Sequence, residues 1–263
     1  MLRAIRAKNH GDIYSLLATV REIFKRLLMI RKIGLVVSIA ALSTSAIAAE
    51  APAWNSNLEV GYVSTTGNTE VSSLNAKSKA IRDANVWRTT LEASALNVSD
   101  KVGTTAEKYG LSAQADKKIG ESSYLFGRIG FKTNRFDGFK SRTSETVGYG
   151  FDILKGDEKQ WNAEIGAGAR QTELTTGEKT SDVVARASTL FNWKISGTAT
   201  FSQELKTEGG KDGYVTNSVT SLLNQISGNF SSKISFSTEH TSEVPAGTEK
   251  MNTETAVSLV FAY

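Results

Sequence analysis

The side chains best suited to nucleophilic or acid–base chemistry lie near the C-terminus, around His240, one of two histidines in the chain. The polar residues close to it in sequence are Ser232, Thr238, Ser242, Glu243 and Asn252. A hydroxyl nucleophile needs a base within hydrogen-bond reach and a third group that orients this base. No nucleophile motif surrounds His240. We therefore expect His240 to lie at the rim of the fold, and we expect a protein that is not an enzyme.

The composition offers few ligands for a metal ion or a cofactor. The chain has no cysteine, which removes thiolate ligands, and two histidines are too few for a histidine cluster. Aspartates in expected loops offer oxygen ligands for a Ca²⁺ ion that bridges to lipopolysaccharide, but they lack the ordered spacing of a Ca²⁺ loop. These aspartates are Asp100, Asp137, Asp182 and Asp212. We therefore expect no metal and no cofactor.

Two glycine pairs, Gly148-Tyr-Gly150 and Gly166-Ala-Gly168, resemble phosphate-binding loops only superficially. Neither pair is followed by Lys-Ser/Thr or by a helical pattern. Within a strand, glycine makes room where the sheet bends or where a large neighbour leans in. We expect that structural role here.

The positive charge of the chain is concentrated at its N-terminus. Residues 1–48 hold eight of the 31 Lys and Arg residues but two of the 27 Asp and Glu residues, so the remainder is slightly acidic, with 23 basic against 25 acidic residues. From Met29 a basic start, an apolar run from Ile33 to Leu42 and small residues up to Ala48 form a secretory signal peptide. We expect cleavage after Ala48, and no nucleic-acid partner.

Residues 1–28 precede this signal and leave two interpretations open. They are either an unusually long basic n-region, or an upstream extension that arises because Met29 is the true start. In both cases the mature protein is the segment 49–263.

The mature segment alternates between apolar and polar residues with period two, over about twelve stretches of some ten residues separated by turn-rich pieces. Successive side chains of a strand point to opposite faces of a sheet. One face is apolar, with Glu145 as its single charged residue, whereas the other carries eighteen charges. From residue 214 to residue 224 the pattern is weakest, because Val215, Val219 and Leu223 alternate with Ser and Thr on both faces.

We interpret this asymmetry as an all-β, closed antiparallel transmembrane barrel of about twelve strands, with its apolar face toward lipid and its polar face toward a lumen. Closure is required because an unpaired backbone group costs several kcal/mol in hydrocarbon. The predicted lumen-lining residues are Glu59, Lys77, Lys79, Arg128, Lys132, Glu164, Arg170, Arg186, Glu204, Lys233, Glu239 and Glu254. Glu59 and Lys77 are expected to face each other if the first hairpin is centred on Asn68.

Aromatic residues near the lower strand ends predict an interfacial girdle. They are Trp54, Trp87, Tyr124, Trp161, Trp193, Phe230 and Tyr263. The upper connections, around residues 99–107, 134–141, 172–181 and 241–251, are expected to be mostly longer than the lower ones, as the outer loops of such barrels are.

From residue 54 to the C-terminus the chain resembles a family of salt-induced outer-membrane proteins whose domain has no known function. The likeness rests on Leu58-Glu-Val-Gly-Tyr62 with Thr66-Gly-Asn-Thr69, on Val147-Gly-Tyr-Gly-Phe151 and on Glu164-Ile-Gly-Ala-Gly-Ala-Arg170. The ending Val257-Ser-Leu-Val-Phe-Ala-Tyr263 resembles an outer-membrane C-terminal signal, with Val257, Leu259, Phe261 and Tyr263 on its apolar face. The resemblance implies recognition by the barrel-assembly machinery and a link to salt stress.

These observations predict a monomer in the outer membrane of a Gram-negative bacterium, exported through the periplasm and surrounded by lipid and lipopolysaccharide. Ten basic and eight acidic residues on the polar face almost cancel, which argues against strong charge selection. A narrow, weakly selective pore for ions or small polar solutes is therefore one expectation. A plugged barrel that acts through its loops or supports the envelope is the other, and a lipid-modifying hydrolase built on His240 is the least favoured.

Overall fold

The computed structural model describes residues 53–65, 71–134, 136, 139–211, 213–244, 247 and 249–263, all within a compact unit that spans Glu50–Tyr263. The expected signal peptide and the segment before it lie outside the described residues. Among the residues that are described, no helix has the length and apolar character needed to cross a bilayer.

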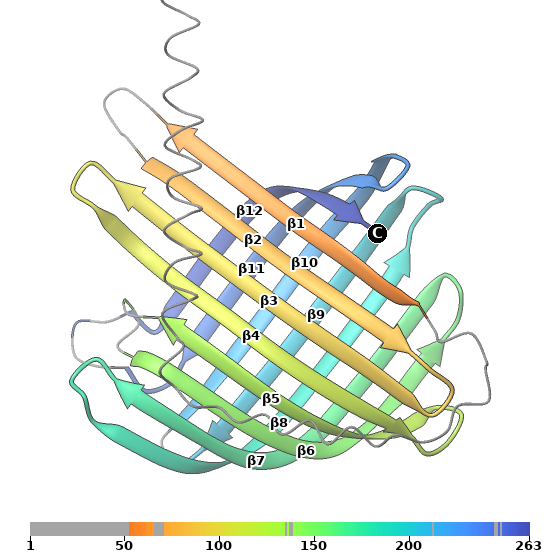
Figure 1. The fold of residues 1–263 in the computed structure, drawn as a ribbon, viewed down its shortest axis with the longest axis horizontal. Coiled ribbons are helices and arrows are strands. Elements are labelled where there is room, and N and C mark those ends of the chain that lie inside the picture. Colours follow the sequence, from red (N-terminus) through yellow and green to blue (C-terminus); the bar gives the residue numbers. More distant parts are fainter. Residues whose placement is uncertain are drawn as a thin grey trace, which may run out of the picture. The chain divides into compact units, whose positions relative to one another are not determined.

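The described part of the chain forms twelve strands that close into one antiparallel ring, as the alternation predicts (Figure 1). Each strand pairs with the next along the chain, and β12 pairs with β1 to complete the ring. The strands are β1 (Trp54–Thr65), β2 (Val71–Asp83), β3 (Trp87–Asp100), β4 (Thr104–Lys118), β5 (Ser123–Asn134), β6 (Phe139–Lys155), β7 (Lys159–Leu174), β8 (Lys179–Lys194), β9 (Ala199–Gly210), β10 (Gly213–Ser227), β11 (Phe230–Thr241) and β12 (Met251–Ala262).

The two faces of the ring differ in exposure as their composition requires. Apolar side chains of the outer face are exposed, with 77% of Val183 and 69% of Val147 accessible. Charged side chains of the opposite parity are buried or half-buried, and they make contacts between strands that are not neighbours. Only the inside of a closed ring allows such contacts, so the charged face lines the lumen.

The expected difference in loop length is largely wrong. Several strands continue past the boundaries inferred from their hydrophobic pattern, because their polar ends remain paired with their neighbours beyond the apolar band. Apart from 66–70 and 242–250, the upper connections are as short as the lower ones. The short upper connections are 101–103, 135–138, 175–178 and 211–212, and the lower ones are 84–86, 119–122, 156–158, 195–198 and 228–229.

Strand β10 reverses the usual distribution of polar and apolar side chains. Val215 pairs with Glu208, and Val219 with Glu204, which places both valines on the inner face. Hydroxyl groups occupy the outer face, where Thr220 Oγ1 donates to Gln203 Oε1 at 2.5 Å and Gln203 Nε2 donates to Ser218 Oγ at 3.1 Å. The segment with the weakest sequence pattern is thus a regular strand whose orientation is set by the register of its neighbours.

Candidate functional site: the charged lumen

The structure places all twelve predicted lumen residues in ion pairs on the inner face. Glu59 pairs with Lys233, Lys77 with Glu254, and Glu164 with Arg186. The remaining pairs are Lys79–Glu92, Arg128–Glu92, Lys132–Glu239, Lys108–Glu239, Arg170–Asp182, Arg170–Glu208 and Lys206–Glu204. Acidic and basic groups therefore alternate around the wall, and most of the charge is compensated locally.

A buried cluster links β4, β5, β7 and β8 in the lower half of the lumen. Glu164 Oε2 accepts hydrogen bonds from Arg186 Nη1 at 2.7 Å and from Ser188 Oγ at 3.0 Å. Its Oε1 accepts from Gln114 Nε2 at 2.7 Å and from the Tyr124 hydroxyl at 3.1 Å. The carboxylate thus receives four donors, which compensate for its burial.

Tyr124 therefore does not belong to the aromatic girdle, and that assignment is wrong. Its side chain is 3% exposed and lies inside the ring, with the guanidinium of Arg88 4.6 Å from the ring centre. The neighbouring outward residue, Leu125, is 49% exposed. Parity with Leu125 already indicates the inward direction, whereas closeness to a strand end does not distinguish the two faces.

The glycine pairs of β6 and β7 make room for these inward aromatic rings, as expected. A Cβ atom at Gly150 would overlap the ring of Tyr124, and one at Gly166 would come within 2.9 Å of the Phe126 ring. Phe126 is 3% exposed. Both rings thus contact the wall at glycine positions, and they fill part of the lumen beside β6 and β7.

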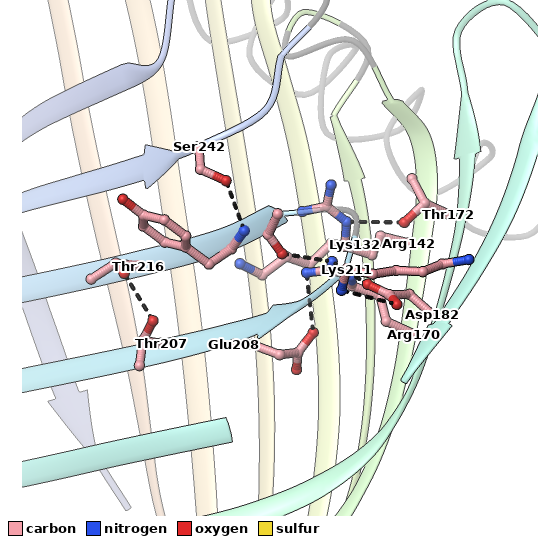
Figure 2. Close-up of polar contacts among 12 residues, drawn as sticks. Lys132, Arg142, Arg170, Thr172, Asp182, Thr207, Glu208, Lys211, Thr216 and Ser242 are labelled. Atoms are coloured by element: carbon pink, nitrogen blue, oxygen red, sulfur yellow. Dashed lines mark hydrogen bonds and ion pairs between the residues drawn. The ribbon is translucent and has the colours of Figure 1, made fainter. Parts of the chain in front are cut away.

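A second cluster lies in the upper half of the lumen (Figure 2). Arg170 Nη2 lies 3.3 Å from Asp182 Oδ2 and donates to the Gly213 carbonyl at 3.1 Å, while its Nη1 lies 3.9 Å from Glu208 Oε1. Arg142 donates to Thr172 Oγ1 at 3.3 Å in the same region. The side chains of Arg170 and Asp182 are 5% and 4% exposed, so this group forms part of the wall.

Asp182 is therefore not a loop residue, and its expected placement in a loop is wrong. It lies within β8, on the inner face, because the strand begins three residues earlier than the apolar pattern suggests. Asp100 caps a turn, since its Oδ1 accepts from the backbone N–H groups of Val102 and Gly103. Asp137 and Asp212 lie outside the described residues. Within the described ranges, three or more His, Asp or Glu side chains do not converge in a metal-binding group.

Ion pairs to Glu239 cross the lumen. Lys132 on β5 and Glu239 on β11 are six strands apart in either direction around the ring, yet Lys132 Nζ lies 3.3 Å from Glu239 Oε2. Lys108 on β4 approaches the other carboxylate oxygen at 3.9 Å. Parity along the strands predicts that Lys132 and Glu239 face the lumen, but their contact depends on the separation of opposite walls. This bridge spans the lumen near its upper end.

Space nevertheless remains beside the lumen side chains. Lys77, Lys79 and Lys206 keep 30 to 35% of their side-chain surface exposed, and their acidic partners keep 27 to 31%. Inward side chains can be accessible only from within the ring. The lumen is thus lined by charged groups that water can reach.

The outer surface carries the other residues singled out from the sequence. The aromatic residues of the expected girdle, apart from Tyr124, stand on this surface near the lower strand ends, namely Trp54, Trp87, Trp161, Trp193, Phe230 and Tyr263. Val257, Leu259, Phe261 and Tyr263 are also exposed there.

The His240 ring packs against Tyr214 with ring centres 5.5 Å apart and the ring planes tilted by 32°, on the outer face beside Thr216. Ser242 Oγ accepts from the Tyr214 backbone N–H at 2.8 Å, and Ser232 Oγ lies 3.5 Å from the Asn224 carbonyl. These hydroxyl groups are thus directed toward the backbone. The described contacts of His240 do not assemble a nucleophile, a base and an orienting group.

A closed, twelve-stranded antiparallel barrel with an apolar outside and a charged inside defines an outer-membrane-type barrel. Residues 58–263 match the family described as protein of unknown function, DUF481, and the chain belongs to that family. An uncharacterized protein of Escherichia coli (strain K12), YdiY, is 28% identical over 207 residues, which cover 78% of this chain and 82% of the relative.

Solved porin and channel structures share the fold. The NanC porin superposes with a TM-score of 0.52 at 12% identity and covers 79% of this chain and 99% of its own. An outer membrane channel from Pseudomonas putida F1 gives a TM-score of 0.50 at 10% identity, with 82% and 97% coverage. At this identity the likeness defines the architecture and gives no information about a substrate.

Proposed function

We propose that this protein is a narrow, weakly selective pore for ions and small polar solutes in the outer membrane. The observation that supports it best is the charged lumen, whose side chains are paired with one another and yet remain partly accessible. Charge compensation disfavours strong selection by sign, since a selective filter requires an excess of one charge. The Lys132–Glu239 bridge keeps the passage narrow at its upper end.

The proposal includes the route to the membrane. A leader removed after Ala48 would take the chain to the periplasm, and the terminal strand with Phe261 and Tyr263 would be recognised by the assembly machinery. The aromatic residues at the lower rim would then meet the lipid headgroups, and the upper rim would meet lipopolysaccharide. In this proposal the barrel acts as a monomer without a cofactor and without catalysis, and salt stress is the condition to examine first.

Planar-bilayer conductance of the refolded protein tests the pore. We expect discrete openings and a reversal potential near zero in a gradient of KCl. A folded barrel that stays silent at all voltages would contradict the proposal and favour the plugged barrel. A reversal potential close to the equilibrium potential of K⁺ or of Cl⁻ would contradict the weak selectivity, but it would not contradict the pore.

A further inference from the structure

The accessible charges of the lumen differ in sign from the buried ones. Apart from Lys118–Asp83 and Lys155–Asp152 at the lower rim, each ion-paired side chain of the inner face is either at most 10% or at least 20% exposed. The buried group holds more acids than bases, namely Glu59, Asp116, Glu164 and Asp182 against Arg170 and Arg186. The accessible group holds more bases than acids, namely Lys77, Lys79, Arg88, Lys108, Arg128, Lys132, Lys206 and Lys233 against Glu92, Glu204, Glu208, Glu239 and Glu254. A solute in the lumen therefore meets mainly basic groups among the described residues.

Two of these accessible bases flank a glycine on β5. Arg128, Gly130 and Lys132 are separated by single outward residues, so all three lie on the inner face. A Cβ atom at Gly130 would meet no other atom within 4 Å, and the side chain of Lys132 is 53% exposed. The wall between the two bases is thus open toward the lumen, and we call this place the Gly130 recess.

Small hydroxyl residues border the recess on both sides. The register partners of Gly130 are Ser112 on β4 and Ser144 on β6. Ser112 Oγ donates to Glu92 Oε2 at 3.2 Å, which confirms that this register position faces the lumen. The neighbouring strands therefore place only short side chains next to Gly130.

The charged ends of Arg128 and Lys132 lean toward different carboxylates. Arg128 Nη2 lies 3.6 Å from Glu92 Oε2 on β3, whereas Lys132 Nζ lies 3.3 Å from Glu239 Oε2 on β11. Both separations are longer than the about 2.7–2.9 Å of a strong charge-assisted hydrogen bond, and each carboxylate also contacts a second lysine. A guanidinium has five N–H donors and an ammonium three, so both bases can donate to a further anion.

The spacing of the two bases selects the shape of that anion. Residues four apart on a strand have Cα atoms about 13 Å apart, and the two charged ends lean away from each other. A small inorganic ion can therefore contact one base at a time. A linear anion with a carboxylate at each end can contact both, while its apolar middle lies over Gly130.

We propose that the Gly130 recess binds a linear dicarboxylate, with one carboxylate at Arg128 and the other at Lys132. The passage of such solutes rests on the proposed pore, but their binding is measurable in a barrel that does not conduct. Monovalent ions gain from one base only, and salt screens that contact, so a reversal potential near zero in KCl agrees with the proposal.

Titration calorimetry of the full chain in detergent micelles tests the charge and the shape of the ligand. Adipate, adipamide and 1,4-diaminobutane share a chain of four methylene groups and differ only in the end groups. Adipate should bind at least about tenfold more tightly than the other two, because hydrogen bonds between charged groups are lost with them. Equal affinity for the three compounds overturns the proposal, as does tighter binding of 1,4-diaminobutane.

Pentanoate tests the contact at both ends. It has a single carboxylate on a chain of four carbon atoms, and its affinity should be about tenfold lower than that of adipate. Pentanoate that binds as tightly as adipate overturns the two-ended arrangement.

Charge variants locate the ligand. Arg128→Met and Lys132→Met should each lower the affinity for adipate about tenfold, because one carboxylate loses its partner. The control Lys77→Met also removes one accessible lysine, but this lysine pairs with Glu254 on β12, and the affinity should stay within about twofold of the wild type. Heat-modified gel mobility checks folding, and Lys132→Met suffices if the Arg128 variant does not fold. An equal effect of the Lys77 and Lys132 variants overturns the site.

Filling the recess tests its position on the wall. Gly130→Leu should lower the affinity for adipate at least about tenfold, because the leucine side chain occupies the space that the methylene chain needs. Gly127→Leu is the matched control, since Gly127 is equally open but lies on the outer face of the same strand, and it should leave binding unchanged. Wild-type affinity in a folded Gly130→Leu variant overturns the proposal.

Binding and conductance separate this site from the pore. A barrel that binds adipate but stays silent in planar bilayers contradicts the pore and supports the site. A barrel that conducts but does not bind adipate overturns the site and leaves the pore.

Discussion

Glu59 and Lys77 lie directly opposite each other on β1 and β2, yet each forms its ion pair with a different residue. Glu59 Oε2 accepts from Lys233 Nζ at 2.8 Å, and Lys77 Nζ lies 3.9 Å from Glu254. Both partners are two strands away, because the concave inner wall brings the tips of long side chains on alternate strands together. The predicted register is confirmed by the strand pairing, whereas the ion pairs follow the curvature of the ring.

The cross-lumen bridge should limit the current. In a Lys132→Met, Glu239→Gln variant both charges are removed, and we expect a larger single-channel conductance because the bridge no longer spans the passage. The matched control is Lys140→Met, Glu173→Gln, which removes a 2.8 Å pair elsewhere on the sheet. Recordings in the same bilayer compare the variants. Unchanged conductance without the bridge would show that the limiting constriction lies elsewhere.

Substitutions of Tyr124 and Gly150 should have non-additive effects on folding stability. Gly150→Ala places a methyl group against the Tyr124 ring, and we expect a loss of about 1–3 kcal/mol in the free energy of unfolding, as in other overpacked sites. Combining it with Tyr124→Ala should remove this penalty. Gly127→Ala is the control, since a Cβ atom there meets no other atom within 4 Å. Denaturant titration in lipid vesicles measures the wild type, the two single variants, the double variant and the control, and additive losses would contradict the contact.

Removal of one partner of the Glu164–Arg186 ion pair should strongly reduce the folding stability. Glu164→Gln leaves the Arg186 guanidinium buried without its counter-charge, and we expect a loss of about 3–5 kcal/mol. Removing both charges with Glu164→Gln and Arg186→Met should cost less than Glu164→Gln alone. Glu173→Gln breaks a pair whose lysine is largely exposed, and it should cost much less than Glu164→Gln because solvent screens the two charges. Equal losses for the single and the double variant would contradict the argument.

A charged residue on the outer face should destabilise the fold. Arginine at Leu111, Ile129 or Ile165 should reduce folding stability by about 2–4 kcal/mol if the residue lies near the bilayer midplane. Ser112→Arg, on the inner face next to Leu111, is the control, and we expect little loss there because Glu92 is close. Vesicle folding titrations compare the two faces. If all outer-face variants fold as well as the wild type, the assignment of inside and outside is wrong.

His240 should be dispensable. His240→Ala removes a ring that packs against Tyr214 at the surface, and we expect unchanged folding and unchanged conductance. Release of fatty acid from labelled phospholipid or lipid A by the wild-type protein, together with its loss in this variant, would instead establish a hydrolase.

Alternation of residue types is a local property, and the sequence alone therefore predicts about twelve strands, the two faces of the strands other than β10, and the closure of the ring. Parity along each strand separates Lys77, Glu164 and Arg186 from the apolar side without knowledge of the neighbours. Closure follows from the need to pair every backbone group in lipid. The family also follows from sequence, through the segments around Leu58, Val147 and Glu164.

The tertiary structure decided the contacts that depend on register and on the width of the ring. The Lys132–Glu239 bridge joins residues 107 positions apart, and no local pattern encodes the distance between opposite walls. Strand β10 has no charge on either face, so only its pairing with Glu204 and Glu208 directs Val215 and Val219 inward. The short pairing between β1 and β12, from Asn57↔Ala262 to Val60↔Leu259, likewise depends on how far the first and last strands stay together.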